Sequence, residues 1–263
     1  MSDDERRALA RRAIALIDLT DLADDHSPAG IDALCARAAE HGTAAVCVWP
    51  EFVPRCVAQL DGTDVRVATV VNFPSGDEPP AEVLNATETA LSDGADDVDL
   101  VLPYRAFLAG DHAPARELIR AVAGLVGGDG RVLKVILETG EFRDDLAVRA
   151  AGRLAVEHGA DFLKTSTGKT LVGATPAAVR SMLTVVAEAA ERGRRIGIKP
   201  SGGIRTLDDA AGYLALADEV MGLGWATPAT FRFGASGLLD ALLAELAGSE
   251  GDGDTAAATG TSY

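Results

Sequence analysis

The chain has 263 residues, of which 48% are hydrophobic and 24% are charged, and its formal net charge is −16 at pH 7. These fractions are typical of a globular protein and argue against a disordered or fibrous chain. The acidic charge argues against nucleic acids and anionic membranes as partners, because both bind basic surfaces, and a small anion would need locally presented cations or backbone N–H groups.

The first residues carry no recognisable targeting signal. Acidic residues open the chain and no small-residue cleavage site follows an apolar core, so a signal peptide is not expected. No run reaches the ~20 apolar residues that a membrane-spanning helix needs. The spacings of Cys35, Cys47 and Cys56 fit no zinc or redox motif. We therefore expect reduced thiols and a cytoplasmic location.

Short β-branched runs alternate with longer amphipathic segments along most of the chain. The expected strands lie at 14–20, 44–50, 65–73, 97–103, 132–139, 162–167, 196–203 and 231–236. Apolar residues between these runs recur at helical spacing, as at Val179, Met182, Leu183 and Val186. Ser27, Thr175 and Thr206 are expected to cap helices at their N-termini.

Eight strands that alternate with helices predict a parallel sheet, and the even number favours closure into a TIM (β/α)8 barrel. An open doubly wound sheet lacks support, because no GxGxxG motif follows the first strand. We predict one barrel domain at 1–246 and a flexible tail at 247–263, where the periodic pattern ends. Tyr263 closes that tail, either incidentally or as a residue that visits a pocket.

Charged residues stand inside five of the apolar runs, where a strand normally has hydrophobic side chains. They are Asp18, Asp99, Lys134, Lys164 and Lys199. A buried ion pair would explain any one of them, but so many desolvated charges seldom stabilise a protein by themselves. Charged side chains at such positions are therefore candidates for chemistry.

Lys164 and Lys199 belong to the sixth and seventh expected strands, which are neighbours in a barrel. The outer face of each strand meets apolar helices, so we expect both ammonium groups in the interior. Desolvation and repulsion between two cations would lower the pKa of one lysine and give an amine that attacks carbonyl groups. Lys134 is expected to be a buried structural partner of a strand carboxylate.

Glycine-rich segments follow the last three expected strands. They are Thr167-Gly168-Lys169, Ser201-Gly202-Gly203 and Phe233-Gly234-Ala235-Ser236. Glycines let backbone N–H groups approach a phosphate, and barrels often bind phosphate at the loops after strands 7 and 8. Although a lone Gly-Gly pair is usually a turn, two clusters at these loops predict a phosphate site, to which Lys169 and Arg205 would add charge.

Metal catalysis has little support in the sequence. The histidines, His26, His41, His112 and His158, are expected in loops or at helix ends, and none is paired at ligand spacing. No metal or other cofactor is expected. Taken alone, Cys47 is interpreted as a buried apolar thiol.

Eight runs carry a specific resemblance to a known family. In order they are LIDLTDL, AAVCVWPEFVP, ATVVNFPSG, GADDVDLVLPYRAFLAGD, LKVILETGE, GADFLKTSTGK, IKPSGGIRT and RFGASGLL. Together they resemble deoxyribose-phosphate aldolases from about residue 10 to 246, and the combination of GADFLKTSTGK with IKPSGGIRT is highly specific.

The resemblance implies a metal-independent class I aldolase on a TIM barrel. Its reaction would be the reversible cleavage of 2-deoxy-D-ribose 5-phosphate to acetaldehyde and D-glyceraldehyde 3-phosphate. By the same resemblance, Lys164 would form a Schiff base, Lys199 would tune it, and Asp99 would serve as acid and base. Tyr263 would share a proton-handling role with the tyrosine that ends similar chains.

The resemblance also implies substrate-binding residues. The positions around the substrate are matched by Asp18, Thr20 and Cys47. The phosphate pocket is matched by Lys169, Gly203, Gly234 and Ser236, and the glycine clusters add Thr167, Gly168, Gly202 and Ala235. Two departures stand out: Gly237 removes a hydroxyl beside the phosphate loop, and Ser201 adds one near the active face. Because the backbone N–H of Gly237 still donates, phosphate binding is expected to be weakened rather than abolished.

Two other functions stay open at this stage. A phosphosugar isomerase or epimerase would use the glycine loops without a Schiff base, and insensitivity to borohydride would indicate it. A non-catalytic phosphosugar-binding protein would bind phosphate and fail every turnover assay. Because exposed barrel faces commonly form dimers, we expect a homodimer.

Overall fold

Eight parallel strands form a single sheet in the computed structural model, which describes residues 1–128 and 130–248. Their order is β7-β6-β5-β4-β3-β2-β1-β8. The strands are β1 (Ile17–Asp21), β2 (Ala45–Val48), β3 (Arg66–Val71), β4 (Asp97–Val101), β5 (Val132–Ile136), β6 (Phe162–Lys164), β7 (Gly197–Lys199) and β8 (Phe233–Ala235). Parallel bridges from Ile198 to Phe231 and from Ser201 to Gly234 bring the two edges together, which confirms the predicted TIM (β/α)8 barrel.

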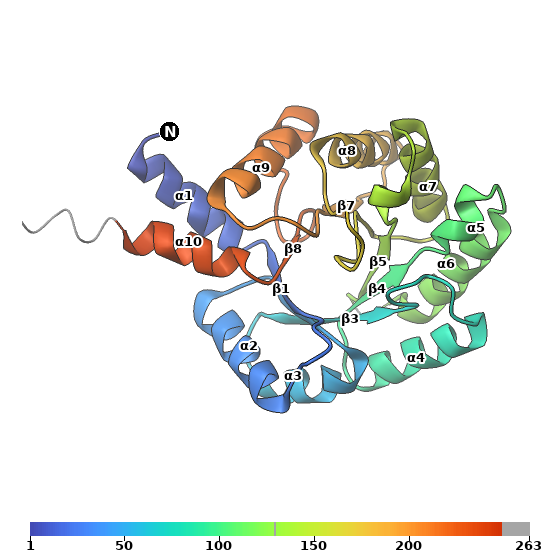
Figure 1. Cartoon of the computed structure of the whole chain (residues 1–263), viewed down its shortest axis with the longest axis horizontal. Helices are drawn as coiled ribbons and strands as arrows, with labels where there is room; N and C mark the ends of the chain where they lie inside the picture. Colours follow the sequence, from blue (N-terminus) through green and yellow to red (C-terminus); the bar gives the residue numbers. More distant parts are fainter. Residues whose placement is uncertain (129, 249–263) are drawn as a thin grey trace, which may run out of the picture.

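Helices surround the strands on the outside of the barrel (Figure 1). They are α1 (Asp3–Ile14), α2 (Pro28–His41), α3 (Val53–Gln59), α4 (Pro80–Ser92), α5 (Tyr104–Leu108), α6 (Ala113–Val126), α7 (Asp145–Glu157), α8 (Pro176–Glu191), α9 (Leu207–Met221) and α10 (Leu238–Ala247), with short 3-10 helices at Pro50–Phe52 and Thr139–Glu141. The predicted N-caps are confirmed, because Ser27, Thr175 and Thr206 each accept a backbone hydrogen bond in the first turn of α2, α8 and α9.

Each predicted strand is present, but several strands end earlier than predicted. β6 ends at Lys164 and β7 at Lys199, and the loops that follow them turn at Gly168 and Gly202, whose φ angles are 80° and 85°. The first strand begins at Ile17 rather than at residue 14, because Ile14 is the last residue of α1. The loops after β6 and β7 consequently begin directly after the two lysines.

Apolar side chains fill the space between the strands and the helices. On α8, Val179, Met182, Leu183 and Val186 are all buried, as their spacing predicted. Cys35, Cys47 and Cys56 are buried free thiols. Within the described residues, no helix is both long and apolar enough to cross a membrane.

The predicted boundary after residue 246 falls within the last turn of α10, which extends to Ala247. The predicted tail beyond residue 248, including Tyr263, lies outside the described residues.

Candidate active site

A cluster of charged side chains lies at the centre of the barrel, below the mouth of a pocket. Its members are Asp18 on β1, Asp97 and Asp99 on β4, Lys134 on β5, Lys164 on β6, Lys199 on β7 and Arg232 next to β8. All are buried, with Lys164 3% exposed and Arg232 4% exposed. Side chains two residues apart on a strand share a face, which places Asp97 with Asp99. The parallel register then pairs Asp99 with Lys134 and Lys164 with Lys199.

Asp99 joins the three lysines of the cluster. Its Oδ2 accepts hydrogen bonds from Nζ of Lys164 at 2.7 Å and from Nζ of Lys199 at 2.8 Å. Its Oδ1 accepts one from Nζ of Lys134 at 3.0 Å. Desolvation works to raise the pKa of Asp99, but the three cations hold it well below the ordinary range. Asp99 is therefore a carboxylate at neutral pH.

Lys199 lies between two carboxylates. Its Nζ is 2.6 Å from Oδ2 of Asp18 and 2.8 Å from Oδ2 of Asp99. Although desolvation disfavours the ammonium, these two negative charges outweigh it and raise the pKa of Lys199. Arg232 completes the arrangement by donating to Oδ1 of Asp18 at 2.7 Å.

Lys164 is the member of the cluster that reaches the pocket. Desolvation is the largest influence on its amine, and the neighbouring cation of Lys199 adds to it, so the pKa of Lys164 is lowered even though Asp99 opposes the change. The predicted side-by-side placement of Lys164 and Lys199 is confirmed. Their environments shift the two pKa values in opposite directions, as a nucleophile beside a permanent cation requires.

Lys134 contacts carboxylates deeper in the barrel, as predicted. Its Nζ donates to Oδ2 of Asp97 at 2.7 Å as well as to Asp99. Asp97 also accepts from Nε of Arg66 at 2.8 Å. The negative charges of Asp97 and Asp99 raise the pKa of Lys134 against the effect of desolvation. Lys134 therefore retains its proton.

The cluster holds one more basic group than carboxylates. Lys134, Lys164, Lys199 and Arg232 face Asp18, Asp97 and Asp99. An unbalanced charge is costly inside a protein, and a neutral Lys164 balances the set. Arg66 also pairs with Asp97, but its side chain is 30% exposed, so water solvates part of its charge.

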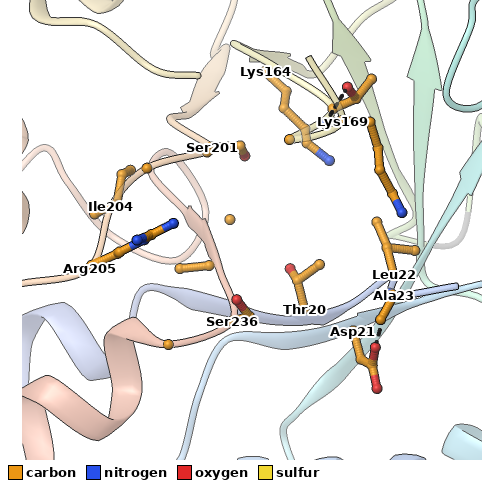
Figure 2. Close-up of a pocket in the computed structure, with 17 residues that line it drawn as sticks. Thr20, Asp21, Leu22, Ala23, Lys164, Lys169, Ser201, Ile204, Arg205 and Ser236 are labelled. Atoms are coloured by element: carbon orange, nitrogen blue, oxygen red, sulfur yellow. Dashed lines mark hydrogen bonds between the residues drawn. The ribbon is translucent and has the colours of Figure 1, made fainter. Parts of the chain in front are cut away.

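The pocket above the cluster has a volume of about 590 Å³ (Figure 2). Its lining includes ten of the predicted site residues: Thr20, Lys164, Thr167, Gly168, Lys169, Gly202, Gly203, Gly234, Ala235 and Ser236. Asp18, Cys47, Asp99 and Lys199 are fully buried and do not line it, so they lie behind the pocket surface. The structure thus brings the three glycine clusters to one cavity, as the sequence predicted.

One side of the pocket is suited to an anion. Gly203 and Arg205 follow β7, and Ser236 and Gly237 immediately precede α10. The first backbone N–H groups of a helix and its dipole favour a negative group. Figure 2 shows the guanidinium of Arg205 and the hydroxyl of Ser236 on this side, across the cavity from Lys169.

Lys169 lies on the opposite wall of the pocket. Its Nζ is 2.9 Å from Oδ1 of Asp24 and 5.9 Å from the centre of the Trp49 ring. Both partners keep the ammonium at the rim in this structure. An anion at the other side would therefore attract Lys169 away from an exposed ion pair, which has little stability of its own.

Two further predicted residues can be placed. Ser201 lines the pocket, but its hydroxyl oxygen is buried beside Gly234 and has no hydrogen-bond partner among the described residues. Cys47 is fully buried on β2, and desolvation raises the pKa of its thiol, so it carries no charge there. Across the described residues, no group of three or more His, Cys, Asp or Glu side chains is arranged to hold a metal ion.

Sequence reasoning missed two buried residues of this region, Arg232 and Glu138. Glu138 lies two residues after the end of β5 and accepts hydrogen bonds from Thr167 and Thr170. The available signal was a charged residue at the end of an apolar run, in RFGAS for Arg232 and in VILETG for Glu138. The same pattern identified the three lysines and two of the aspartates in the sequence.

Comparisons with known proteins agree with the geometry. The family model of DeoC/LacD family aldolases matches residues 12–242. A curated deoxyribose-phosphate aldolase from Agrobacterium fabrum is 49% identical over 248 residues, which are 93% of this chain and 94% of that protein.

Solved structures show the same barrel. A Toxoplasma gondii protein provisionally identified as a deoxyribose-phosphate aldolase superimposes with a TM-score of 0.85 at 27% identity, over 93% of this chain and 96% of that one. Deoxyribose phosphate aldolase from Aeropyrum pernix, described as a tetramer, gives a TM-score of 0.76 at 22% identity, over 94% of this chain and 99% of that one. At the lower identity the likeness concerns the fold alone.

Proposed function

This chain belongs to the DeoC/LacD aldolase family, and we propose that it is a lyase that reversibly cleaves 2-deoxy-D-ribose 5-phosphate to D-glyceraldehyde 3-phosphate and acetaldehyde. The substrate follows from the relative that is 49% identical over 93% of the chain. The observation that carries the proposal is a desolvated Lys164 at the pocket, joined through Asp99 to a charged Lys199.

Lys164 is the proposed nucleophile. Its lowered pKa increases the share of neutral amine, which adds to the C1 aldehyde of the open-chain sugar. Loss of water then gives an iminium. As the C2–C3 bond breaks, its electron pair moves toward the iminium, C3 becomes the aldehyde of D-glyceraldehyde 3-phosphate, and an enamine of acetaldehyde stays on Lys164.

Asp99 is the proposed acid and base. Cleavage requires removal of the C3 hydroxyl proton, and the enamine must later receive a proton at C2. The carboxylate of Asp99 is 2.7 Å from the Lys164 amine, and we propose that it exchanges both protons through a water. Hydrolysis of the resulting iminium releases acetaldehyde and restores the lysine. Throughout, the charge of Lys199 disfavours protonation of the free Lys164 amine.

The remaining predicted residues are proposed to bind the substrate. The phosphate would lie against the backbone of Gly203 and Gly237 and the hydroxyl of Ser236, where N–H groups and a helix N-terminus converge. Thr20 would contact the sugar. Asp18 lies 2.6 Å from Lys199, so its proposed contribution is to keep that lysine charged rather than to touch substrate.

Borohydride trapping tests the proposal. Reduction during turnover of 2-deoxy-D-ribose 5-phosphate is expected to inactivate the enzyme permanently and leave a covalent adduct on Lys164, located by peptide mapping. Lys164→Ala should show no adduct. A modified Lys134 or Lys199 would contradict the assignment, and full resistance to borohydride would point to an isomerase or epimerase without a Schiff base.

We further propose that the chain forms a homodimer and acts in the cytoplasm. Exposed apolar side chains such as Leu146 and Leu223 offer surface for a contact between copies. Three free thiols suit a reducing compartment. Light scattering during size-exclusion chromatography would distinguish a dimer from a monomer or tetramer.

A further inference from the structure

We propose that Glu138 is a positioning residue that holds the loop after β6 in its substrate-binding shape. The inference rests on the proposed function, because this loop contributes Thr167, Gly168 and Lys169 to the pocket wall. Glu138 itself is fully buried and does not line the pocket. Its effect on the reaction must therefore pass through the loop.

The carboxylate of Glu138 binds the loop on both sides of Lys169. Its Oε2 accepts hydrogen bonds from the Thr167 hydroxyl at 2.6 Å and from the Thr167 backbone N–H at 3.2 Å. Its Oε1 accepts one from the Thr170 hydroxyl at 3.1 Å. One side chain thus fixes both ends of the segment 167–170.

The contact with Thr167 extends to Lys169. A hydroxyl has one hydrogen, and in Thr167 it points to Glu138, so the oxygen lone pairs are left to accept. The backbone N–H of Lys169 donates to this oxygen at 3.0 Å. Between them, Gly168 has a φ angle of 80°, a conformation that L side chains rarely adopt. The orientation of this turn therefore depends on the Glu138 carboxylate.

Besides Glu138, the middle of the loop has the ion pair of Lys169 with Asp24 and a long hydrogen bond of 3.4 Å from the Thr170 hydroxyl to the Val172 carbonyl. The ends of the loop are fixed by backbone hydrogen bonds, from Thr139 N–H to the Thr165 carbonyl at 2.8 Å and from Ala174 N–H to the Ser201 carbonyl at 2.9 Å. Between these ends Leu171 is fully exposed, at 101%, so apolar packing does not anchor the tip. Because the Lys169–Asp24 ion pair is exposed, we expect the buried hydrogen bonds to Glu138 to contribute most to fixing the pocket-lining part.

The position of Glu138 is costly for folding, which supports a functional reason for it. Its φ and ψ are 59° and 56°, a left-handed conformation that strains a residue with a side chain. Among the described residues, no ion pair includes Glu138, so its buried charge depends on the threonine and backbone donors of this loop. Strain of this kind concentrates at functional sites.

The test compares 2-deoxy-D-ribose 5-phosphate with acetaldehyde, which lacks the phosphorylated part of the sugar. In Glu138→Ala, we expect KM for 2-deoxy-D-ribose 5-phosphate to rise roughly tenfold to a hundredfold, by analogy with the loss on removing a residue that orients a metal ligand. The rate of borohydride trapping with acetaldehyde, which reaches Lys164 without needing the phosphate site, should stay within about twofold of wild type.

Glu138→Gln is the conservative variant. Its amide oxygen can still accept from Thr167 and its amide nitrogen can donate to the Thr170 hydroxyl, so most of the loss in KM should be recovered. An unchanged KM in Glu138→Ala would overturn the proposal. So would a parallel loss of acetaldehyde trapping, because that would show damage to the whole barrel rather than to the loop.

Thr170→Val keeps the test decisive if Glu138→Ala does not fold. Thr170 is half-buried and does not line the pocket. Valine has no hydroxyl, so among the described residues Oε1 of Glu138 keeps only the weak hydrogen bond from the Thr167 backbone N–H, at 3.4 Å. A raised KM with unchanged acetaldehyde trapping supports the proposal, and an unchanged KM overturns it. If wild-type enzyme is not trapped by acetaldehyde at all, the Schiff-base function itself is wrong, a result distinct from failure of the Glu138 variants alone.

Discussion

The three interior lysines differ in their partners rather than in their burial. Lys134 has carboxylates at 2.7 and 3.0 Å, and Lys199 has them at 2.6 and 2.8 Å. Within residues 1–128 and 130–248, Lys164 pairs with one carboxylate, Asp99, which it shares with the other two lysines. A cation between two carboxylates keeps its proton, whereas one that shares a carboxylate with other cations loses it more easily. This difference in partners explains why the pKa of Lys164 is lowered while the pKa values of Lys134 and Lys199 are raised.

The pH profile of Lys199→Leu is the prediction that follows for a single residue. Activity needs the neutral Lys164 amine, so kcat/KM rises as pH increases through the pKa of Lys164. Removing the Lys199 cation removes a charge that lowers this pKa and leaves Asp99 to raise it. We expect the acidic limb of kcat/KM to move to higher pH by at least about one unit.

Lys199→Arg is the matched control for that profile. It retains a permanent cation beside Asp18 and Asp99, so its acidic limb should stay near the wild-type pH even if the larger group reduces kcat. An acidic limb that stays in place in both variants would mean that desolvation alone sets the pKa of Lys164, and the tuning role of Lys199 would be lost.

At the residue scale, the sequence identified charged residues inside apolar strands more readily than charged residues whose partners are distant in the sequence. Lys164 and Lys199 were identifiable because a cation in a β-branched run is unusual by itself. The contribution of Arg232 and Glu138 depends on partners that are distant in the sequence. Arg232 donates to Asp18, and Glu138 accepts from Thr167 and Thr170. Such pairs arise from barrel closure and loop packing, which local patterns do not contain.

At the scale of elements, the alternation of strands and helices was strong enough to place all eight strands. The N-caps at Ser27, Thr175 and Thr206 were also predictable, because a capping side chain acts within one turn of its own helix. The ends of β6 and β7 were not, because the polar residues that follow Lys164 and Lys199 do not by themselves mark where parallel pairing stops. Whether a segment is a helix or a strand could be predicted from its own residues, whereas the position at which each strand ends depends on the loop that follows it.

The contact between β6 and β7 gives a prediction at this scale. A Cβ atom on Gly197 would overlap the ring of Phe162, which lies opposite it in the register that also pairs Lys164 with Lys199. Gly197→Ala should therefore lower the free energy of unfolding by about 1–3 kcal/mol, the usual cost of overpacking a core. Because the same register aligns the two lysines, kcat should fall as well. Urea denaturation and steady-state kinetics measure the two effects.

Gly212→Ala is the control for the glycine substitution. Gly212 lies within α9, and a Cβ atom there would have no neighbour within 4 Å. Alanine should stabilise this helix by about 0.5–1 kcal/mol and leave kcat unchanged. If Gly197→Ala behaved like Gly212→Ala, the close approach of β7 to Phe162 would not constrain the barrel.

At the scale of the whole molecule, a strongly acidic chain surrounds a central cluster in which the charges are nearly balanced. The net charge is −16, whereas the central cluster holds four basic groups and three carboxylates. The global field repels an anionic substrate, so binding depends on local donors at the pocket, such as Arg205 and the N-terminus of α10. The composition indicated which partners to exclude, but only the folded arrangement showed where an anion fits.

The interior carboxylates predict how the stability of the whole barrel depends on pH. Desolvation works to raise the pKa values of Asp18 and Asp99, but the surrounding cations lower them below the unfolded value of about 3.9. A lowered pKa contributes stability that is complete above the unfolded pKa and is lost as pH falls through the folded one. Urea denaturation should therefore give a constant contribution from these groups above about pH 5 and a falling free energy of unfolding below it.

High salt separates this effect from that of the surface charges. Repulsion among surface carboxylates destabilises the fold at neutral pH and is relieved by acid, which is the opposite sign to the effect of Asp18 and Asp99. Salt at about 0.5 M screens exposed charges strongly and buried pairs much less. The free energy of unfolding should thus rise with salt near pH 7, while its fall below about pH 5 persists with a similar slope. Loss of that fall in high salt would show that surface ion pairs, rather than the lysine and aspartate cluster, cause acid unfolding.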